Sequence, residues 1–476
     1  MATRRATAPK KPVSEGISSQ DRGEVDRLEA TDEGVSRHGA TRPGRGRVKG
    51  NGAKRPELRL VRGGLGELGG APAPTAATPA HRRVRQPSTG REARRLVLLT
   101  AALSAFGLVI VLSASSVASL TADGSPWSLF IKQALWTAIG GVAFLVATRV
   151  DLTRLRRFAV PFLLISAALL VAVLAPGLGR TAEGSSRWIG AGPLRLQPSE
   201  LAKLAFAIFA ADLIARRAGA RDETKAIVIP TCTVLGVMAL LILRQPDMGT
   251  AVVLCCLTAS MLYVSGVKSG LLLRLLVVLS LLGGVVALWA PYRRARLLSF
   301  FDPFAHASTS GYQVVQSLVA LGSGHLTGTG LGGSVAKWGF LPNAWTDFVF
   351  AIIGNELGLV GSLAVLAAFA WFTWLGIRIA SRTADRFQRL LATGITCWVA
   401  AQAVINVGGV IGIMPETGIP LPFLSSGGSS LVVVLAAVGL LVNIARQPAR
   451  RAGAPSNVDP SPRRRQMAPA RAKRSS

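Results

Sequence analysis

The chain has 476 residues, of which 50% are hydrophobic and 16% are charged, and its formal net charge is +30. This charged fraction is low for a soluble protein, and a soluble chain of this length would be expected to divide into two or more cores. The composition therefore excludes an ordinary soluble enzyme and indicates an integral membrane protein.

Most of the positive charge lies in the two tails, before Leu96 and after Ile444. Residues 1–95 contain almost no aromatic side chains, so they bury too little apolar surface to offset the entropy of ordering. We expect residues 1–95 and 446–476 to be disordered basic tails held near anionic lipid. No nucleic-acid-binding module accompanies the charge, so nucleic acid is not an expected partner.

The four cysteines and four histidines indicate neither a metal site nor a disulfide framework. All four cysteines fall in apolar segments without CxxC spacing, and the histidines are scattered. We therefore predict no metal site made by cysteine or histidine.

Between the tails, roughly ten apolar stretches have the length of a membrane-spanning helix. They lie at 96–117, 129–148, 159–176, 199–216, 225–243, 249–267, 270–290, 346–377, 388–412 and 429–445. The sequence therefore predicts an all-α, polytopic domain over residues 96–445, with a large loop between the seventh and eighth helices.

Short loops rich in arginine and lysine set the orientation of this domain. They are centred on Arg154, Arg217 and Arg382, and ten crossings place all three on the same side as both tails. That side is the cytoplasm, so the loops at 177–198, 291–345 and 413–428 are expected outside. Cations that remain in the outer loops indicate an anionic ligand there.

Polar residues begin the fourth predicted helix and directly precede the sixth. Ser199 is a candidate helix cap, and Glu200 and Lys203 are three residues apart, so they share a helix face and can pair. This pair is either structural or part of a polar cavity open to the outside. Asp247 is expected to cap the helix that follows it.

The stretch from Pro291 to Gly358 is the longest polar interruption of the apolar region. Its glycine-rich segment 328–333 is interpreted as a tight turn, with a phosphate cradle as the alternative. Asp347 lies at its end among aromatic residues, where a raised pKa would make a good base near neutral pH. The alternative is a helix N-terminal acid stabilised by the dipole. Glu356 falls on nearly the opposite flank of that helix and indicates a separate polar contact.

The segment from Asn406 to Ser430 contains three prolines and several glycines, which prevent a regular helix. Irregular backbone at membrane depth is tolerated where it is buried in protein or lines a cavity. No histidine and no GxSxG motif accompany its serines, so covalent catalysis is not expected. Ser425 and Ser429 are instead candidate substrate-binding residues.

These motifs resemble the SEDS family, which includes FtsW, RodA and SpoVE. The 406–430 segment is similar to the family signature PxTGxPLPFxSYGGSS, with Ser426 in place of tyrosine. Further matches lie at 186–189 with 197–203, at 245–250, at 302–317 and at 341–348. Trp345 and Asn355 depart from a histidine and an acid that are frequent in the family.

The resemblance implies a ten-helix peptidoglycan glycosyltransferase, most similar to the division-type branch. Such an enzyme polymerises lipid II into a glycan strand at the outer face of the plasma membrane during septal cell-wall synthesis. The implied partners are a class B penicillin-binding protein, which crosslinks the product, and other division proteins.

Asp347 falls where the family has its essential aspartate, so it is the candidate catalytic base. The leaving pyrophosphate carries negative charge that cations must stabilise. The candidate substrate-binding residues with charged side chains are Arg187, Glu200, Lys203, Arg296 and Lys337. A divalent cation such as Mg²⁺ could share this task, although the sequence contains no dedicated metal cage.

Three other functions are consistent with parts of the sequence. A lipid II flippase would use the intramembrane polar residues as a path, and an elongation-type, RodA-like polymerase would share the same chemistry. A scaffold for division proteins would depend on the tails alone.

Overall fold

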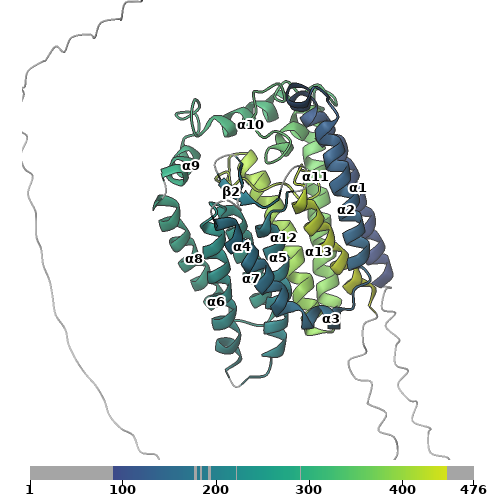
Figure 1. The fold of residues 1–476 in the computed structure, drawn as a ribbon, viewed down its shortest axis with the longest axis vertical. Helices are drawn as coiled ribbons and strands as arrows, with labels where there is room; N and C mark the ends of the chain where they lie inside the picture. The colour runs from purple at the N-terminus through teal and green to yellow at the C-terminus, as the bar shows by residue number, and fades with distance from the viewer. Residues whose placement is uncertain are drawn as a thin grey trace, which may run out of the picture. The chain divides into compact units, whose positions relative to one another are not determined.

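The computed structural model describes residues 89–175, 180–182, 185–190, 195–220, 222–289 and 291–447. All of these residues belong to one compact structural unit, Arg83–Ser476. The predicted all-α fold class is confirmed, with one addition (Figure 1). Strands β1 (Arg180–Ala182) and β2 (Ser185–Trp188) pair antiparallel as a small hairpin in an outer loop. The predicted disordered tails lie mostly outside the described residues.

The long helices of the described residues follow the predicted spans. They are α1 (Thr89–Asp123), α2 (Ser128–Ala147), α4 (Ala159–Leu174), α5 (Pro198–Arg216), α6 (Glu223–Leu243), α7 (Met248–Val264), α8 (Ser269–Trp289), α11 (Val349–Arg382), α12 (Arg386–Val410) and α13 (Ser429–Arg446). Six of these helices are long and apolar enough to cross a membrane, and three more are apolar but shorter. The protein is therefore a multi-pass membrane protein, while the total of ten crossings stays a prediction.

Helix α1 begins at Thr89 rather than near Leu96, where the sequence analysis ended the tail. The reason is an acid in its first turn. Glu92 is only 4% exposed and pairs with Arg378 and Arg382 at the end of α11. A paired acid at a helix N-terminus is favourable, so the helix extends into the polar sequence.

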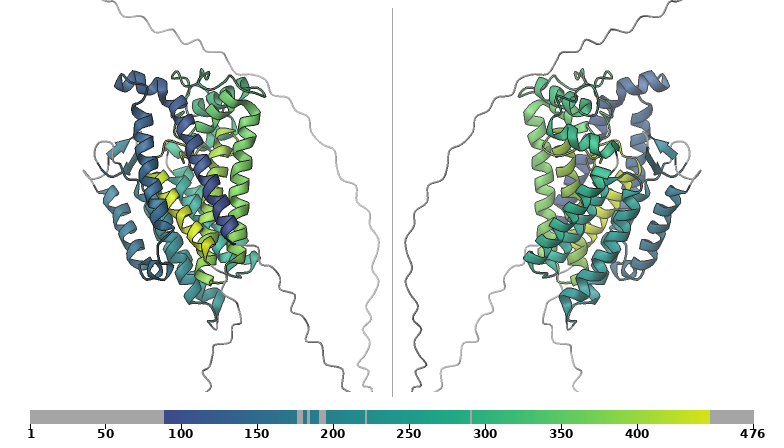
Figure 2. Two further views of the ribbon diagram at one scale, coloured as in Figure 1. Left: turned by 90° about the vertical axis from the view of Figure 1, so that its right-hand side faces the viewer. Right: turned by 90° about the vertical axis from the view of Figure 1, so that its left-hand side faces the viewer.

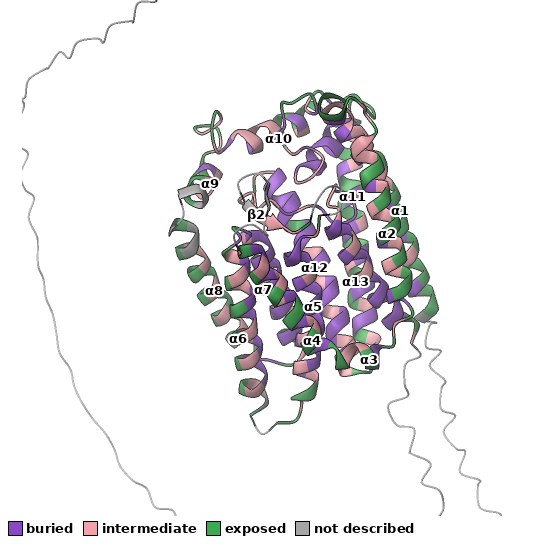
Figure 3. Ribbon diagram, in the orientation of Figure 1, coloured by how far each residue is buried: buried purple, intermediate pink, exposed green. Residues whose placement is uncertain are grey.

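Helices α5, α12 and α13 form the centre of the bundle. Helix α12 packs against α5, α7, α11 and α13, and these central helices are the most buried (Figure 3). Helices α2, α4 and α8 expose large apolar side chains, including Val142, Leu164 and Leu281. Apolar side chains at the periphery are expected where lipid covers the protein. Two further views show the helices side by side along one direction (Figure 2).

The predicted large loop contains two helices of its own, α9 (Pro291–Phe301) and α10 (Tyr312–Ser323). Both lie at the same end of the bundle as the β hairpin, and the short helix α3 (Leu152–Arg157) lies at the other end (Figure 1). Helix α10 is held in place by a buried serine. Ser317 Oγ donates to the carbonyl oxygen of Val410 at 2.7 Å, which joins α10 to the end of α12.

Helix α11 is interrupted at Gly358, whose φ of 68° and ψ of −163° are not helical. The segment before α11 supplies the missing partners. The amides of Thr329 and Gly330 donate to the carbonyls of Asn355 and Glu356, each at 3.0 Å. Gly328, Gly330 and Gly332 all have positive φ, so the predicted tight turn is confirmed.

Candidate active site

Asp347 lies just before the first residue of α11, in the segment that joins the large loop to that helix. Its position is fixed through its backbone, because the side-chain Nδ2 of Asn406 on α12 donates to the backbone carbonyl of Asp347 at 2.7 Å. The same nitrogen donates to the Ile419 carbonyl at 2.8 Å. Asn406 therefore joins the Asp347 segment to residues 411–428, which we call the proline-rich loop.

Asp347 borders a small polar chamber of about 70 Å³. The chamber is lined by Arg187, Arg296, Gln313, Asn343, Asp347, Phe348, Ile405, Asn406, Gly409, Val410, Glu416, Thr417, Gly418 and Ile419. Arg296 on α9 and Glu416 in the proline-rich loop form an ion pair at 2.9 Å. Burial raises the pKa of Glu416 above its usual value, and the nearby Arg296 opposes that effect.

Asp347 also borders a second, larger cavity of about 760 Å³. Its lining combines aromatic and cationic side chains. They include Trp136, Trp188, Trp345, Lys132, Arg187 and Arg195. Arg187, Asp347 and Gly418 line both cavities, so the carboxylate lies where the two meet. A group at this junction can contact both a ligand in the large cavity and the polar side chains of the small chamber.

Arg187 reaches the junction from strand β2. Its Nε donates to the carbonyl of Gln245 at 3.0 Å, and an Nη donates to the carbonyl of Pro246. Gly418 completes the junction from the proline-rich loop with a φ of +67°. A Cβ atom there would lie 3.5 Å from Asp347 Oδ2 and 3.9 Å from an Arg187 Nη. Glycine therefore favours this backbone conformation, whereas a Cβ atom there would make only ordinary van der Waals contacts with the two side chains.

The structure brings together three of the predicted site residues, Asp347, Arg187 and Arg296, and leaves Lys337 elsewhere. Lys337 Nζ lies 3.3 Å from Glu356 and donates to the Gly332 carbonyl at 2.6 Å. Lys337 lines neither of the two cavities. Glu356 also accepts from Ser113 on α1 at 2.7 Å, so the predicted separate polar contact of Glu356 is confirmed.

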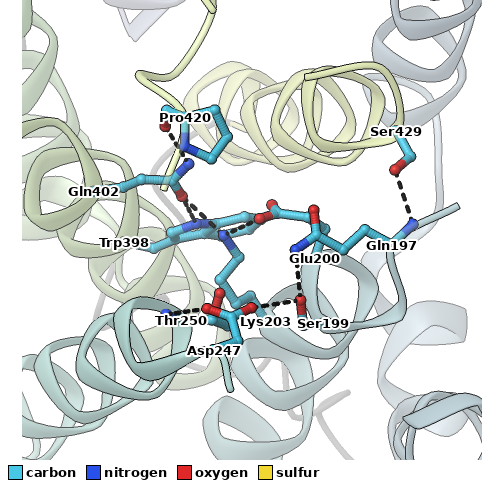
Figure 4. Close-up of polar contacts among 10 residues, drawn as sticks. All are labelled: Gln197, Ser199, Glu200, Lys203, Asp247, Thr250, Trp398, Gln402, Pro420 and Ser429. Atoms are coloured by element: carbon cyan, nitrogen blue, oxygen red, sulfur yellow. Dashed lines mark hydrogen bonds and ion pairs between the residues drawn. The ribbon is translucent and has the colours of Figure 1, made fainter. Parts of the chain in front are cut away.

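Glu200 and Lys203 form the predicted ion pair at 2.8 Å, with side chains only 1% and 0% exposed (Figure 4). Neither residue lines the two cavities. The predicted capping role of Ser199 is wrong, because α5 starts at Pro198 and Ser199 Oγ donates instead to Asp247 at 3.0 Å. The capping role of Asp247 is confirmed by its bond from the Thr250 amide at 3.0 Å.

Ser425 and Ser429 are buried and hold backbone groups in place. Ser425 Oγ accepts from the Leu421 amide at 2.8 Å, and Ser429 Oγ accepts from the Gln197 amide at 3.0 Å. The large cavity is lined instead by the residues between them, 426–428. Contact of Ser425 and Ser429 with substrate stays a prediction.

The two departures from the family pattern lie in different places. Trp345 lines the large cavity beside Asp347, so it changes the surroundings of the carboxylate directly. Asn355 faces away toward α10, where its Nδ2 donates to the Ala320 carbonyl at 2.8 Å and to Ser323 Oγ at 2.7 Å. It therefore joins two helices rather than facing Asp347.

Four further residues at or near the site were not predicted from the sequence: Glu416, Asn406, Gln313 and Gln402. Glu416 carried a signal, because it is an acid inside the proline-rich signature, and ionisable groups at such places are usually functional. The three amide side chains gave no signal in the sequence, because their importance depends on which groups the fold brings near them. Among the described residues, no group of three or more His, Cys, Asp or Glu side chains is placed to hold a metal ion.

Residues 94–450 match the model of a protein family that comprises FtsW, RodA and SpoVE and is described as "cell cycle protein". The chain is 42% identical over 351 residues to the probable peptidoglycan glycosyltransferase FtsW of Mycobacterium tuberculosis, covering 74% of this chain and 67% of that protein. It is 42% identical over 352 residues to the protein of the same name from Alcanivorax borkumensis, covering 73% and 91%.

Two solved structures resemble this fold. One is a chain from a peptidoglycan synthase complex described as coordinating polymerization and crosslinking, with a TM-score of 0.62 and 28% identity, covering 74% of this chain and 97% of that one. The other is the rod shape determining protein RodA of Thermus thermophilus, with a TM-score of 0.55 and 27% identity, covering 74% and 96%.

Proposed function

The chain belongs to the FtsW, RodA and SpoVE family of cell cycle proteins, and on that premise we propose that it is a peptidoglycan glycosyltransferase. It polymerises lipid II into glycan strands at the outer face of the plasma membrane. Its similarity to proteins named FtsW favours a role in septal synthesis and cell division over the elongation role of RodA.

The reaction joins two saccharides by a single displacement. A sugar hydroxyl of one substrate attacks the anomeric carbon of the other, and the bond to the lipid pyrophosphate breaks. The donor is α-linked and the polymer is β-linked, so the configuration inverts. Asp347 takes the proton from the attacking hydroxyl, which is the role of a general base.

The observation that carries this proposal is the place of Asp347 where two cavities meet. A polymerase must place its base beside the saccharides. The large cavity of about 760 Å³ leaves room for them next to the carboxylate, and the small chamber of about 70 Å³ brings Arg296 and Glu416 near the same carboxylate. Half-buried tryptophans in the large cavity offer apolar faces to sugar rings.

Cations near Asp347 support the stabilisation of the leaving pyrophosphate. Arg187 lines both cavities, and Arg296 lines the small chamber together with Glu416. A divalent cation such as Mg²⁺ stays a prediction. Mg²⁺ typically binds one or two carboxylates together with substrate phosphates, and the carboxylates available in the chamber are Asp347 and Glu416.

The proposed partners follow from the chemistry of the product. A glycan strand must be crosslinked, and a solved relative comes from a complex that coordinates polymerization with crosslinking. We therefore include a class B penicillin-binding protein and other division proteins as partners of this chain at the septum.

Polymerisation of purified lipid II by the full-length chain with its crosslinking partner tests the proposal. Asp347→Asn should abolish polymer while the protein still inserts and binds its partner. Asp385→Asn is the matched control, because Asp385 caps α12 by accepting from the Gln388 amide at 2.9 Å and asparagine caps equally well. Polymer formation at the normal rate by the Asp347 variant would refute the assignment.

The flippase alternative predicts lipid II crossing sealed vesicles without polymer. Its expected path used Glu200, Lys203 and Asp247, which are all buried. Glu200 and Lys203 are paired with each other, and Asp247 caps α7. Since none of the three lines the two cavities, the enzyme remains the better supported function.

A further inference from the structure

We propose that Lys203 and Gln402 are positioning residues that hold the proline-rich loop in place beside Asp347. The buried Glu200–Lys203 pair orients the Gln402 amide, and that amide holds the loop by a backbone carbonyl. This inference rests on the proposed role of Asp347 as the base.

The first link is the surroundings of the Lys203 ammonium group (Figure 4). Its nitrogen lies 2.8 Å from Glu200 Oε1 and 2.9 Å from Gln402 Oε1, and 5.0 Å from the centre of the Trp398 ring. With a side chain that is 0% exposed, Lys203 does not reach a ligand in either cavity. Its charge acts on its protein neighbours.

The second link is the orientation of the Gln402 amide. Gln402 Oε1 accepts from Lys203 Nζ and also from Trp398 Nε1, the latter at 2.8 Å. Lysine and tryptophan side chains only donate hydrogen bonds here, so they distinguish the oxygen of the amide from its nitrogen. The nitrogen must therefore face the other way, where it donates to the Pro420 carbonyl at 2.9 Å.

The third link joins Pro420 to the reaction centre. Gln402 and Asn406 are one turn apart on α12, and they hold the consecutive carbonyls of Pro420 and Ile419. The preceding residue, Gly418, lies beside the Asp347 carboxylate. A shift of the loop at Pro420 would therefore move the backbone that borders the base.

An ion pair buried among apolar helices is weak evidence for a purely stabilising role. Removing two charges from water is costly, and apolar replacement of such a pair is often neutral or stabilising. Glu200 Oε2 is also buried without a hydrogen-bond partner among the described residues. The ordering of the Gln402 amide gives this pair a role that an apolar pair could not supply.

The test uses Lys203→Met, Gln402→Leu and the double variant in the full-length chain with its crosslinking partner. Turnover and KM are measured with purified lipid II. Misplacement of reacting groups by about 1 Å can cost on the order of 100-fold, so each single variant should lower kcat by about 10- to 100-fold. KM should change by less than about threefold, because the interactions that bind the substrate equally in the ground state and the transition state are unchanged.

Hydrogen exchange of the amides in residues 416–421 supplies a readout that does not depend on catalysis. Both single variants should speed this exchange, and the double variant should be no worse than the more severe single one. Trp398→Phe is a milder variant that keeps a ring near Lys203 but removes one donor to Gln402. It should speed the same exchange to a smaller extent.

Asn443→Leu is the matched control. Asn443 on α13 donates to the carbonyls of Ala147 and Val150, on the side of the bundle away from Asp347, so its loss should leave residues 416–421 unchanged. A raised KM with normal kcat, additive losses in the double variant, or unchanged exchange would overturn the proposal. If Asp347→Asn stayed active, Asp347 would not be the base, and the exchange result would still test the network. Absence of polymer from the parent chain would instead refute the proposed function.

Discussion

Asn406 offers the sharpest test of how the active site is held together. Its side-chain nitrogen donates to the backbone carbonyls of Asp347 and Ile419, and the residue is 5% exposed. Asn406→Leu keeps the branching of the side chain but removes both hydrogen bonds. The Asp347 segment and the proline-rich loop would then lose the side chain that joins them.

The expected cost can be worked from those two bonds. Each contributes about 0.5–1.5 kcal/mol net, and a buried carbonyl left unpaired costs about 1–3 kcal/mol. Two carbonyls are left unpaired, so Asn406→Leu should destabilise the protein by about 2–6 kcal/mol. Because the Asp347 backbone also shifts, kcat with lipid II should fall by about 100-fold.

Asn443→Leu separates these two effects, because Asn443 also donates to two backbone carbonyls, at 3.0 and 2.7 Å. The two variants should show similar losses of thermal stability in detergent. Only Asn406→Leu should lose turnover per folded molecule. Equal turnover in both variants would show that this amide stabilises the fold without positioning the base.

Three further changes test other parts of the site. Gly418→Ala places a side chain where φ is +67°, at a cost of about 1–2 kcal/mol, and should lower kcat in the lipid II assay. A Gly418→Ala enzyme with normal kcat would show that backbone strain at residue 418 does not disturb the base. Burial raises the pKa of Glu416, so the folded state favours the protonated carboxyl group. The stability of the protein should therefore fall as the pH rises from the usual pKa of a glutamate through the raised pKa of Glu416. Glu416→Gln should therefore melt higher than the parent at pH 7.5, and the difference should vanish below about pH 4; a lower melting temperature at pH 7.5 would mean that the Arg296 pair outweighs burial. Lys337→Met leaves buried Glu356 without its cation and should cost about 3–5 kcal/mol in thermal unfolding. KM for lipid II should stay unchanged in that variant, and a raised KM would instead favour the substrate contact predicted from the sequence.

The sequence predicted the helices because their apolar length is a local property. It also predicted the Glu200–Lys203 pair and the Asp247 cap, since both depend on residues close together along the chain. The position of Asp347 before an apolar helix was likewise readable from the sequence.

Contacts between segments that are far apart along the chain could not be predicted from the sequence. Lys337 was grouped with Asp347 by charge and side, yet it pairs with Glu356 because α11 is interrupted at Gly358 and the preceding segment folds against it. Ser199 looked like a cap, but Asp247 is a nearby acceptor only once α5 and α7 pack together. Pairing across the bundle therefore decides which polar residues reach the site.

The proposed mechanism depends most directly on the carboxylate of Asp347. The decisive measurement is the length and amount of glycan made from purified lipid II by the Asp347→Asn protein in complex with its crosslinking partner. If Asp347 is the base, a protein that is folded and assembled should make no polymer. Glycan strands formed at the parent rate would contradict that role.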